Sequence, residues 1–268
     1  MKNTRKWIAA IMAVLMLVLM AACGNGGNAA NENKAGYRTL EEIKAAGTIN
    51  IGVFSDKNPF GYVDENGEYQ GYDVYFARRL AEDMGVELNL VSTEAANRIE
   101  YLQTGKVDII LANFTVTPER AEEVDFALPY MNVALGVISP DSNVITSLDN
   151  WNADDQMIVI SGTTAETYCL DNGYEILSFA SNIDAQAALT SGKADAWVVD
   201  NEVAVKMAGE QNLTVLDEAM TSEPYALAFA KGSDLVDQVN QALSQLLQDG
   251  TVEQIFQEYD TVYVSPLS

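Results

Sequence analysis

The stretch LQTGKVDIILANFTVTPERAEEVDFALPY, residues 102–130, predicts one complete strand-and-helix unit. Glycine commonly follows a helix in the left-handed conformation, and a short apolar run is typical of a covered parallel strand. Threonine before proline is a common helix start. The predicted order is therefore helix end, buried strand, polar corner and helix start, at Gly105, residues 107–111, residues 113–115 and residues 117–118.

Arg120 lies at the beginning of the last helix of this unit. Ligand clefts of open α/β sheets lie beyond the carboxyl ends of the strands, and the free N–H groups of a helix start favour an anion. A guanidinium can also donate two parallel hydrogen bonds to a carboxylate. The position predicts a carboxylate-binding arginine. The alternative is a surface arginine paired with Glu122 or Glu123.

A similar unit occurs later in the chain. LQTGKVDIILAN (102–113) aligns with LTSGKADAWVVD (189–200), and each has Gly-Lys at a helix end, an Asp before an apolar strand and a polar residue at the strand end. The polar residue is Asn113 in the first unit and Asp200 in the second, and two facing lobes built this way would place Arg120 across a cleft from Asp200. A fixed cation and a fixed anion predict a zwitterionic ligand, such as a free α-amino acid. Alternatively, GKxD is only a common helix-to-strand junction.

The N-terminal residues predict export and a lipid anchor. Residues 1–22 have a basic start and an apolar run too short for a mature membrane span, which is typical of a signal peptide. Small residues before Cys23 match a lipobox, with Met20 where leucine is usual. Lipidated Cys23 would begin the mature protein, and the Gly- and Asn-rich residues 23–36 would form a flexible tether. We therefore expect an extracytoplasmic protein, lipid-anchored to the cell membrane. Secretion with a free Cys23 thiol is the alternative.

Composition excludes several classes of function. The chain has 15 basic and 39 acidic residues, and loss of three basic residues with the signal peptide takes the net charge from −24 to −27. Such a field disfavours nucleic acid as a partner. No histidine is present, which excludes Ser-His-Asp and Cys-His nucleophilic sites and argues against zinc. With Cys23 lipidated, Cys169 has no second cysteine to pair with, so no disulfide is expected.

Alternating strands and helices predict an α/β protein with two lobes. Residues 37–133 and 225–268 are expected to form the first lobe, and residues 134–224 the second. The hinge crossings are expected near residues 133–139 and 222–225.

Further polar and aromatic residues fall near the cleft. Phe54 ends a predicted strand, Lys57 and Phe60 follow it, and Arg98 lies in a helix after the next strand. The two rings are expected either in the core or against the apolar part of a ligand, and Lys57 is expected to be exposed. Asp73 is expected to cap a helix.

Thr163 and Thr164, in SGTT (161–164), follow a predicted strand and open a helix. Several backbone N–H groups at such a start have no partner in the helix, which suits an anion. Plain helix capping is the alternative.

These motifs together resemble the family 3 extracellular solute-binding proteins of amino-acid ABC importers. The motifs are SDKNPFGY (55–62), GYD (71–73), EAANR (94–98), GKVDIILANFTVTPERAEEVDFALPYM (105–131), SGTTAE (161–166) and Asp200. The resemblance covers about residues 40–259 and is greatest to the cysteine-binding surface lipoproteins, with aspartate/glutamate binders close by. It implies the two-lobed type II periplasmic-binding-protein fold, in which each lobe is a small mixed sheet flanked by helices and two hinge crossings join the lobes.

The resemblance also implies roles for the cleft residues. Arg120 would bind the α-carboxylate, with help from Thr115 and from the helix start at residues 163–164. Asp200 would bind the α-ammonium, and Asn113 would add a polar contact.

The side-chain end of the cleft is expected to suit a small polar or acidic ligand. By resemblance, Arg98 stands where acidic-amino-acid binders contact the ligand side chain, whereas Lys57 and Ala95 replace stacking aromatics of binders for cationic amino acids. A buried cation must be satisfied, and a thiol near cations can lose its proton. We therefore expect cysteine first, and glutamate or aspartate second.

The expected partners are a free amino acid, an ABC permease and the membrane through the N-terminal lipid, and the expected state is a monomer. Neither catalysis nor a cofactor nor a metal ion is expected. One alternative is an enzyme of the same fold, such as a dehydratase of amino-acid-like substrates, in which Asp200 and Lys57 would transfer protons. Another alternative is a sensing module for a receptor.

Overall fold

The computed structural model describes residues 36–145, 147–148, 155–216, 220–259 and 265–266. The chain divides into two units, Met1–Lys34 and Ala35–Ser268, and the first lies outside the described residues. The expected signal peptide, Cys23 and nearly all of the tether therefore stay predictions. Within the described residues, no helix has the length and apolar character needed to span a bilayer.

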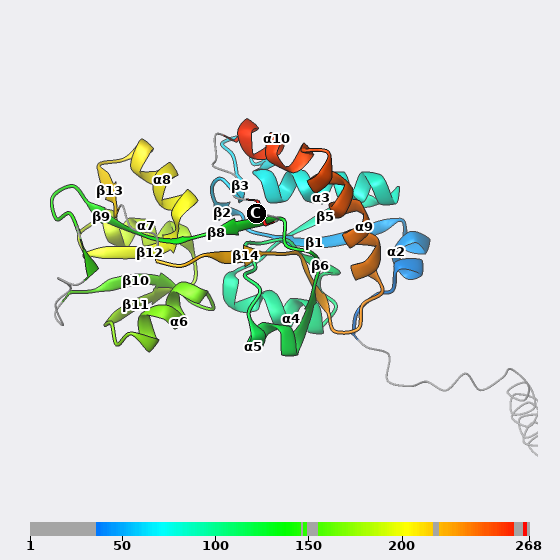
Figure 1. Cartoon of the computed structure of the whole chain (residues 1–268), viewed down its shortest axis with the longest axis horizontal. Helices are drawn as coiled ribbons and strands as arrows, with labels where there is room; N and C mark the ends of the chain where they lie inside the picture. Colours follow the sequence, from blue (N-terminus) through cyan, green and yellow to red (C-terminus); the bar gives the residue numbers. More distant parts are fainter. Residues whose placement is uncertain (1–35, 146, 149–154, 217–219, 260–264, 267–268) are drawn as a thin grey trace, which may run out of the picture. The chain divides into compact units, whose positions relative to one another are not determined.

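The first lobe is built on a five-stranded sheet with the order β5-β1-β6-β15-β7. β1 is parallel to β5 and β6, and β15 is antiparallel to β6 and β7. The strands are β1 (Thr48–Val53), β5 (Glu87–Ser92), β6 (Ile109–Ile110), β7 (Val124–Phe126) and β15 (Ala228–Ala230). The helices are α2 (Leu40–Ala46), α3 (Tyr72–Met84), α4 (Arg98–Gln103), α5 (Pro118–Glu123), α9 (Leu235–Gln248) and α10 (Thr251–Glu258), and the 3-10 turn η1 (Ala95–Asn97) precedes α4. Figure 1 shows α3 and α10 above this sheet and α4 and α5 below it.

The second lobe is built on another five-stranded sheet with the order β11-β10-β12-β9-β13. The strands are β9 (Leu135–Pro140), β10 (Met157–Ile160), β11 (Ile176–Phe179), β12 (Ala196–Asp200) and β13 (Leu213–Val215). The helices are α6 (Thr164–Asp171), α7 (Asn182–Thr190) and α8 (Asn201–Glu210). All residues of β10 and β12 are buried, as expected for apolar strands that are covered on both faces.

The two aligned sequence units occupy equivalent places in the two sheets. β6 and β12 are each the third strand, with a parallel neighbour on one side (β1 or β10) and an antiparallel neighbour on the other (β15 or β9). The predicted repeat is therefore confirmed as a structural one. It brings Asn113 and Asp200 to the carboxyl ends of the two central strands.

The hinge pair consists of β8 (Met131–Val133) and β14 (Glu223–Tyr225), which pair antiparallel and run between the lobes (Figure 1). The expected first hinge at residues 133–139 is wrong for residues 135–139, because β9 pairs with β12 and β13 inside the second sheet. The α/β two-lobed fold is as predicted, and the exact lobe boundaries stay a prediction. A small antiparallel sheet of β2 (Asp56–Lys57), β3 (Gly61–Val63) and β4 (Tyr69–Gln70) precedes α3.

The start of α3 differs from expectation. Asp73 does not cap it; the N-cap is Gly71, with φ 107°. A Cβ at Gly71 would lie 2.2 Å from the backbone oxygen of Phe60, so only glycine fits. Asp73 lies inside the first turn, buried, and accepts a hydrogen bond of 3.0 Å from the Tyr130 hydroxyl.

Candidate functional site

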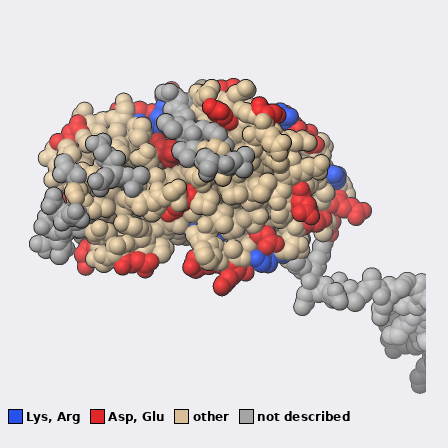
Figure 2. Space-filling view, viewed as in Figure 1, with Lys and Arg blue, Asp and Glu red and all other residues tan. Residues whose placement is uncertain are grey.

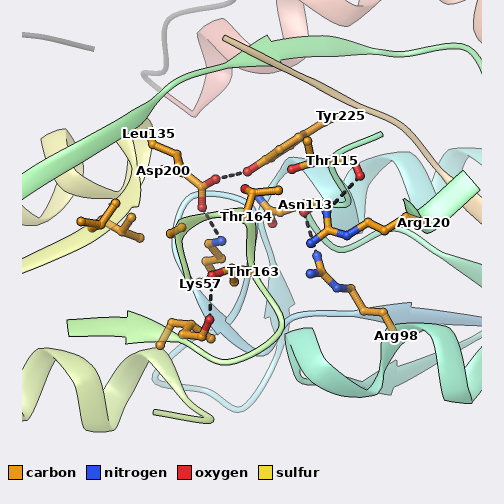
Figure 3. Close-up of a pocket in the computed structure, with 14 residues that line it drawn as sticks. Lys57, Arg98, Asn113, Thr115, Arg120, Leu135, Thr163, Thr164, Asp200 and Tyr225 are labelled. Carbon is orange, nitrogen blue, oxygen red and sulfur yellow. Dashed lines mark hydrogen bonds and ion pairs between the residues drawn. The ribbon is translucent and has the colours of Figure 1, made fainter. Parts of the chain in front are cut away.

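A cavity lies where the two lobes and the hinge meet (Figure 3). The first lobe contributes polar side chains, namely Lys57, Arg98, Asn113, Thr115 and Arg120. The second lobe contributes a mostly apolar wall, namely Leu135, Ile160, Ala165, Val198 and Val199, together with Thr163, Thr164 and Asp200. Tyr225 of the hinge completes the lining. Arg120 and Asp200 thus line one cavity from opposite lobes, as the repeat predicted.

Asp200 ends β12 and is 4% exposed. Its carboxylate forms a close ion pair with the Lys57 ammonium and accepts a hydrogen bond from the Tyr225 hydroxyl (Figure 3). The expectation that Lys57 is exposed is wrong, because its exposed fraction is 5%. A buried carboxylate needs a counter-charge, and Lys57 supplies it in this structure.

Arg120 follows the predicted helix start, at which the Thr117 hydroxyl accepts a hydrogen bond from the Arg120 N–H. Its guanidinium donates to the Thr115 carbonyl (2.9 Å) and to the Gly162 carbonyl (3.1 Å). Burial lowers the pKa of Arg120 to about 10, and the charge of Glu223 opposes this shift. The alternative pairing with Glu122 or Glu123 is not among the ion pairs found in the described residues. A partly buried cation of this kind favours an anionic ligand group.

Arg98 is 2% exposed, and its donors serve the backbone. It donates to the carbonyls of Ala95 (2.9 Å), Ala112 (2.9 Å), Asn113 (2.8 Å) and Gly162 (3.0 Å). Burial, and then the charge of Arg120, lower the pKa of Arg98. Arg98 lines the cavity, but the contacts that hold it are structural ones to the cavity wall.

Asn113 is the non-glycine residue with a positive φ (48°) among the described residues. Its side chain is 3% exposed, lines the cavity, and neither its Oδ1 nor its Nδ2 has a hydrogen-bond partner there. Buried amide groups are rarely left unpaired. This amide therefore has unused hydrogen-bonding groups at the cavity, and its contact with a ligand stays a prediction.

The two threonines of the second lobe lie at the start of α6. The Thr163 hydroxyl caps the helix by accepting from the Glu166 N–H (3.3 Å), so the capping alternative holds for this residue. The Thr164 hydroxyl donates to Glu223 (2.7 Å), and so does the hydroxyl of Thr115 (2.9 Å). Glu223 was missed from the sequence. The sequence indicates Glu223 only weakly, as an acidic residue beside Pro224 in the expected hinge crossing at residues 222–225.

Phe54 and Phe60 are not among the residues that line the cavity. They are 2% and 0% exposed, and their ring centroids lie 5.1 and 5.8 Å from the Lys57 ammonium. Both rings therefore support Lys57 from the core, which is the core alternative of the sequence analysis.

Carboxyl groups behind the cavity are also perturbed. Burial, with a smaller contribution from the charge of Asp200, raises the pKa of Asp73 and of Glu202 to about 7. Lys57 acts in the opposite direction on both. Acidic groups thus surround the one lysine that pairs with Asp200. No group of three or more metal-binding side chains occurs among the described residues.

The lobes are closed around the cavity. Asp56 of the first lobe accepts hydrogen bonds from the backbone N–H (2.7 Å) and the side-chain amide (3.1 Å) of Asn182, the first residue of α7. Gly162 has φ +79°, and a Cβ there would lie 2.6 Å from the Cα of Ala96 in the first lobe. The free volume inside the cavity is only about 20 Å³, roughly the room that one water needs.

Outside the cavity the surface is acidic. Figure 2 shows acidic side chains more often than basic ones on the face it presents. The basic residues Lys57, Arg98 and Arg120 lie in the cavity lining instead. The charge of the cavity is therefore opposite in sign to that of the whole chain.

The family model of the bacterial extracellular solute-binding proteins, family 3, matches residues 49–261. The glutamine-binding protein of an ABC transporter from Bacillus subtilis (strain 168) is 31% identical over 259 residues, which cover 93% of this chain and 95% of that protein. The solved structure of a solute receptor for L-cysteine from Neisseria gonorrhoeae is 43% identical, with a TM-score of 0.80 over 83% of this chain and 93% of that one. A cysteine-binding protein from Campylobacter jejuni is 37% identical, with a TM-score of 0.79 over 84% of this chain and 98% of that one.

Proposed function

The chain belongs to the bacterial extracellular solute-binding proteins of family 3, as an amino-acid-binding receptor of ABC transporters, and we propose that its own ligand is L-cysteine. The observation that carries the proposal is the cavity lined by Arg120 and Asp200 from opposite lobes, beside a small apolar wall.

The charged head group of an amino acid is complementary to the cation of Arg120 and the anion of Asp200. The α-carboxylate would bind the guanidinium of Arg120, and the α-ammonium would bind the carboxylate of Asp200. An ionised carboxylate offers about four acceptor positions, so Asp200 can accept from the ammonium beside Lys57 and Tyr225. The unpartnered amide of Asn113 would supply a further polar contact. A ligand that lacks either charge would leave its partner buried and unpaired, which disfavours it.

The rest of the cavity favours a side chain with a small apolar part. The wall of Leu135, Ile160, Ala165, Val198 and Val199 suits a soft sulfur atom. The two cysteine-binding structures that resemble this chain support the same choice. Glutamate or aspartate is the second candidate, because Lys57, Arg98 and Arg120 make the lining rich in cations.

Binding is expected to close the lobes around the hinge pair. An open form would exchange ligand with solvent, and a bound amino acid would bridge the lobes and favour a closed form. The closed form would then dock on a membrane permease. We also propose that Cys23 carries the lipid that keeps the receptor near that permease.

Titration calorimetry with all common amino acids, under reducing conditions, tests the assignment. The protein is first unfolded and refolded to remove any ligand that copurifies. We expect L-cysteine to bind most tightly and Arg120→Ala to weaken binding about a hundredfold or more, because a buried charge loses its partner. Arg79→Ala is the matched control, since Arg79 pairs with Asp83 on the exposed face of α3.

Tightest binding of any amino acid other than L-cysteine would refute the ligand assignment, and equal affinities of the Arg120→Ala and Arg79→Ala variants would refute the role of Arg120. Mass spectrometry of the amino acid after long incubation separates a receptor from an enzyme of this fold, because a receptor returns its ligand unchanged.

A further inference from the structure

Glu223 is a charged side chain that bonds two cavity-lining residues without lining the cavity itself, and the expected head-group contacts give it no role. It lies on the hinge strand β14, two residues before Tyr225, so both side chains project from the same face of the strand. Tyr225 reaches the anion of the second lobe, Asp200. Glu223 reaches the start of α6 in that lobe, through Thr164.

A single oxygen of Glu223 joins the two lobes. Its Oε2 accepts a hydrogen bond from the Thr115 hydroxyl of the first lobe (2.9 Å) and from the Thr164 hydroxyl of the second (2.7 Å). Both threonines line the cavity, and Thr115 is 4% exposed. The hinge therefore holds one cavity-lining hydroxyl from each lobe.

These bonds fix what the threonines can offer to a ligand. A hydroxyl has one proton, and an ionised carboxylate only accepts, so both protons point at Glu223. The hydroxyl oxygens of Thr115 and Thr164 then have only lone pairs left for the cavity. Lone pairs attract a donor, such as a thiol or an ammonium group, and repel a carboxylate. A ligand carboxylate must accordingly be bound by Arg120 and by backbone N–H groups.

The negative charge of Glu223 also disfavours a second carboxylate on the ligand. It raises the pKa of Arg120 more than the charges of Glu119 or Asp200 do. The cation that would bind the first carboxylate of the ligand is thus partly compensated already. A second carboxylate would meet both this negative charge and the lone pairs of the threonines.

We propose that Glu223 is a specificity-determining residue, which selects an amino acid with a hydrogen-bond donor in its side chain over one with a second carboxylate. This inference rests on the proposed function, because it requires an amino acid in this cavity. It explains how a lining rich in cations can still favour cysteine over aspartate.

Glu223→Gln tests the inference, with affinities for L-cysteine and L-aspartate measured by calorimetry on the mature protein. The glutamine keeps the size of the side chain and removes its charge. We expect the ratio of the aspartate Kd to the cysteine Kd to fall roughly tenfold or more, as a charge within several ångströms changes in a partly buried site. The matched control is Glu119→Gln, which removes an exposed acid near Arg120 that bonds neither Thr115 nor Thr164. That control should leave the ratio within about twofold.

Thr164→Val provides a second variant if Glu223→Gln does not fold, because it removes one of the two bridging hydroxyls. The ratio should then fall in the same direction by a smaller factor. An unchanged ratio in a folded variant that still binds cysteine, or an equal change in Glu119→Gln, would overturn the role of Glu223 and leave the receptor function intact. A wild-type protein that binds no amino acid would overturn both.

Discussion

Replacing Arg98 by methionine should destabilise the ligand-free protein about three times as much as the same change at Arg120. Arg98 is 2% exposed and donates to four backbone carbonyls, those of Ala95, Ala112, Asn113 and Gly162. Methionine keeps much of the apolar stem but has no donor. Arg120 donates to only two carbonyls, and its burial already disfavours its charge.

The expected magnitude follows from these contacts. A buried acceptor that loses its partner costs about 1–3 kcal/mol, and four carbonyls at the lower figure give about 4 kcal/mol. Removing a buried cation next to Arg120 offsets roughly 1 kcal/mol of this. A net loss near 3 kcal/mol lowers the Tm of a domain of this size by roughly 6–12 °C. For Arg120→Met, two carbonyls and the same offset give a net loss of about 1 kcal/mol, or roughly 2–4 °C.

Calorimetric unfolding of the refolded, ligand-free protein measures both values, with Arg79→Met as the matched exposed control. The reasoning fails if Arg98→Met melts with the control. It also fails if Arg120→Met loses as much stability as Arg98→Met, because the additional backbone contacts of Arg98 would then have no effect on stability.

Other perturbations address the charges and the closure of the cavity. Lys57→Met leaves the buried carboxylate of Asp200 without its cation and should lower the free energy of unfolding in urea by about 3–5 kcal/mol. A Lys57→Met, Asp200→Asn double variant should regain most of this loss. A single variant as stable as the wild type would contradict this expectation. Burial raises the pKa of Asp73 to about 7, so its contribution to stability is complete below about pH 4 and is lost as pH rises to about 7. Asp73→Asn should therefore make the decline of Tm between pH 4 and 7 shallower than in the wild type, and an unchanged slope would argue against a raised pKa. Asp56→Ala removes two hydrogen bonds to Asn182 across the lobes and should lower the affinity for every ligand by about tenfold. Calorimetry that shows a lower affinity for one ligand alone would contradict a role of Asp56 in closure.

The parts of the fold that local chemistry determines could be predicted from the sequence. Gly105, Thr117 and Pro118 act within a few residues of themselves, so the helix ends that they mark are found in the structure. β6 is shorter than the apolar run 107–111, because only Ile109 and Ile110 have partners in both neighbouring strands. The aligned units located the cavity because equal βα units deliver their strand ends to equivalent positions.

The partners of buried charges could not be predicted in this way. Lys57 was expected in solvent because nothing near it in the sequence neutralises it, whereas its partner is Asp200, far along the chain. Glu223 likewise bonds Thr115, which lies 108 residues away. The role of Asp73 was mistaken for a related reason, since the close approach of Phe60 to Gly71 is a tertiary contact. Pairings of this kind arise only once the lobes have folded.

Gly162 has a consequence for how the receptor could be studied. The lobes meet there backbone to backbone, and an added methyl group would collide with Ala96 only when they are shut. Alanine at this position would thus act as a spacer between the lobes, and its positive φ would also strain the turn before α6, whose Gly162 carbonyl accepts from Arg98 and Arg120 when the lobes are shut. Such a variant should populate a partly closed conformation that persists long enough to be observed.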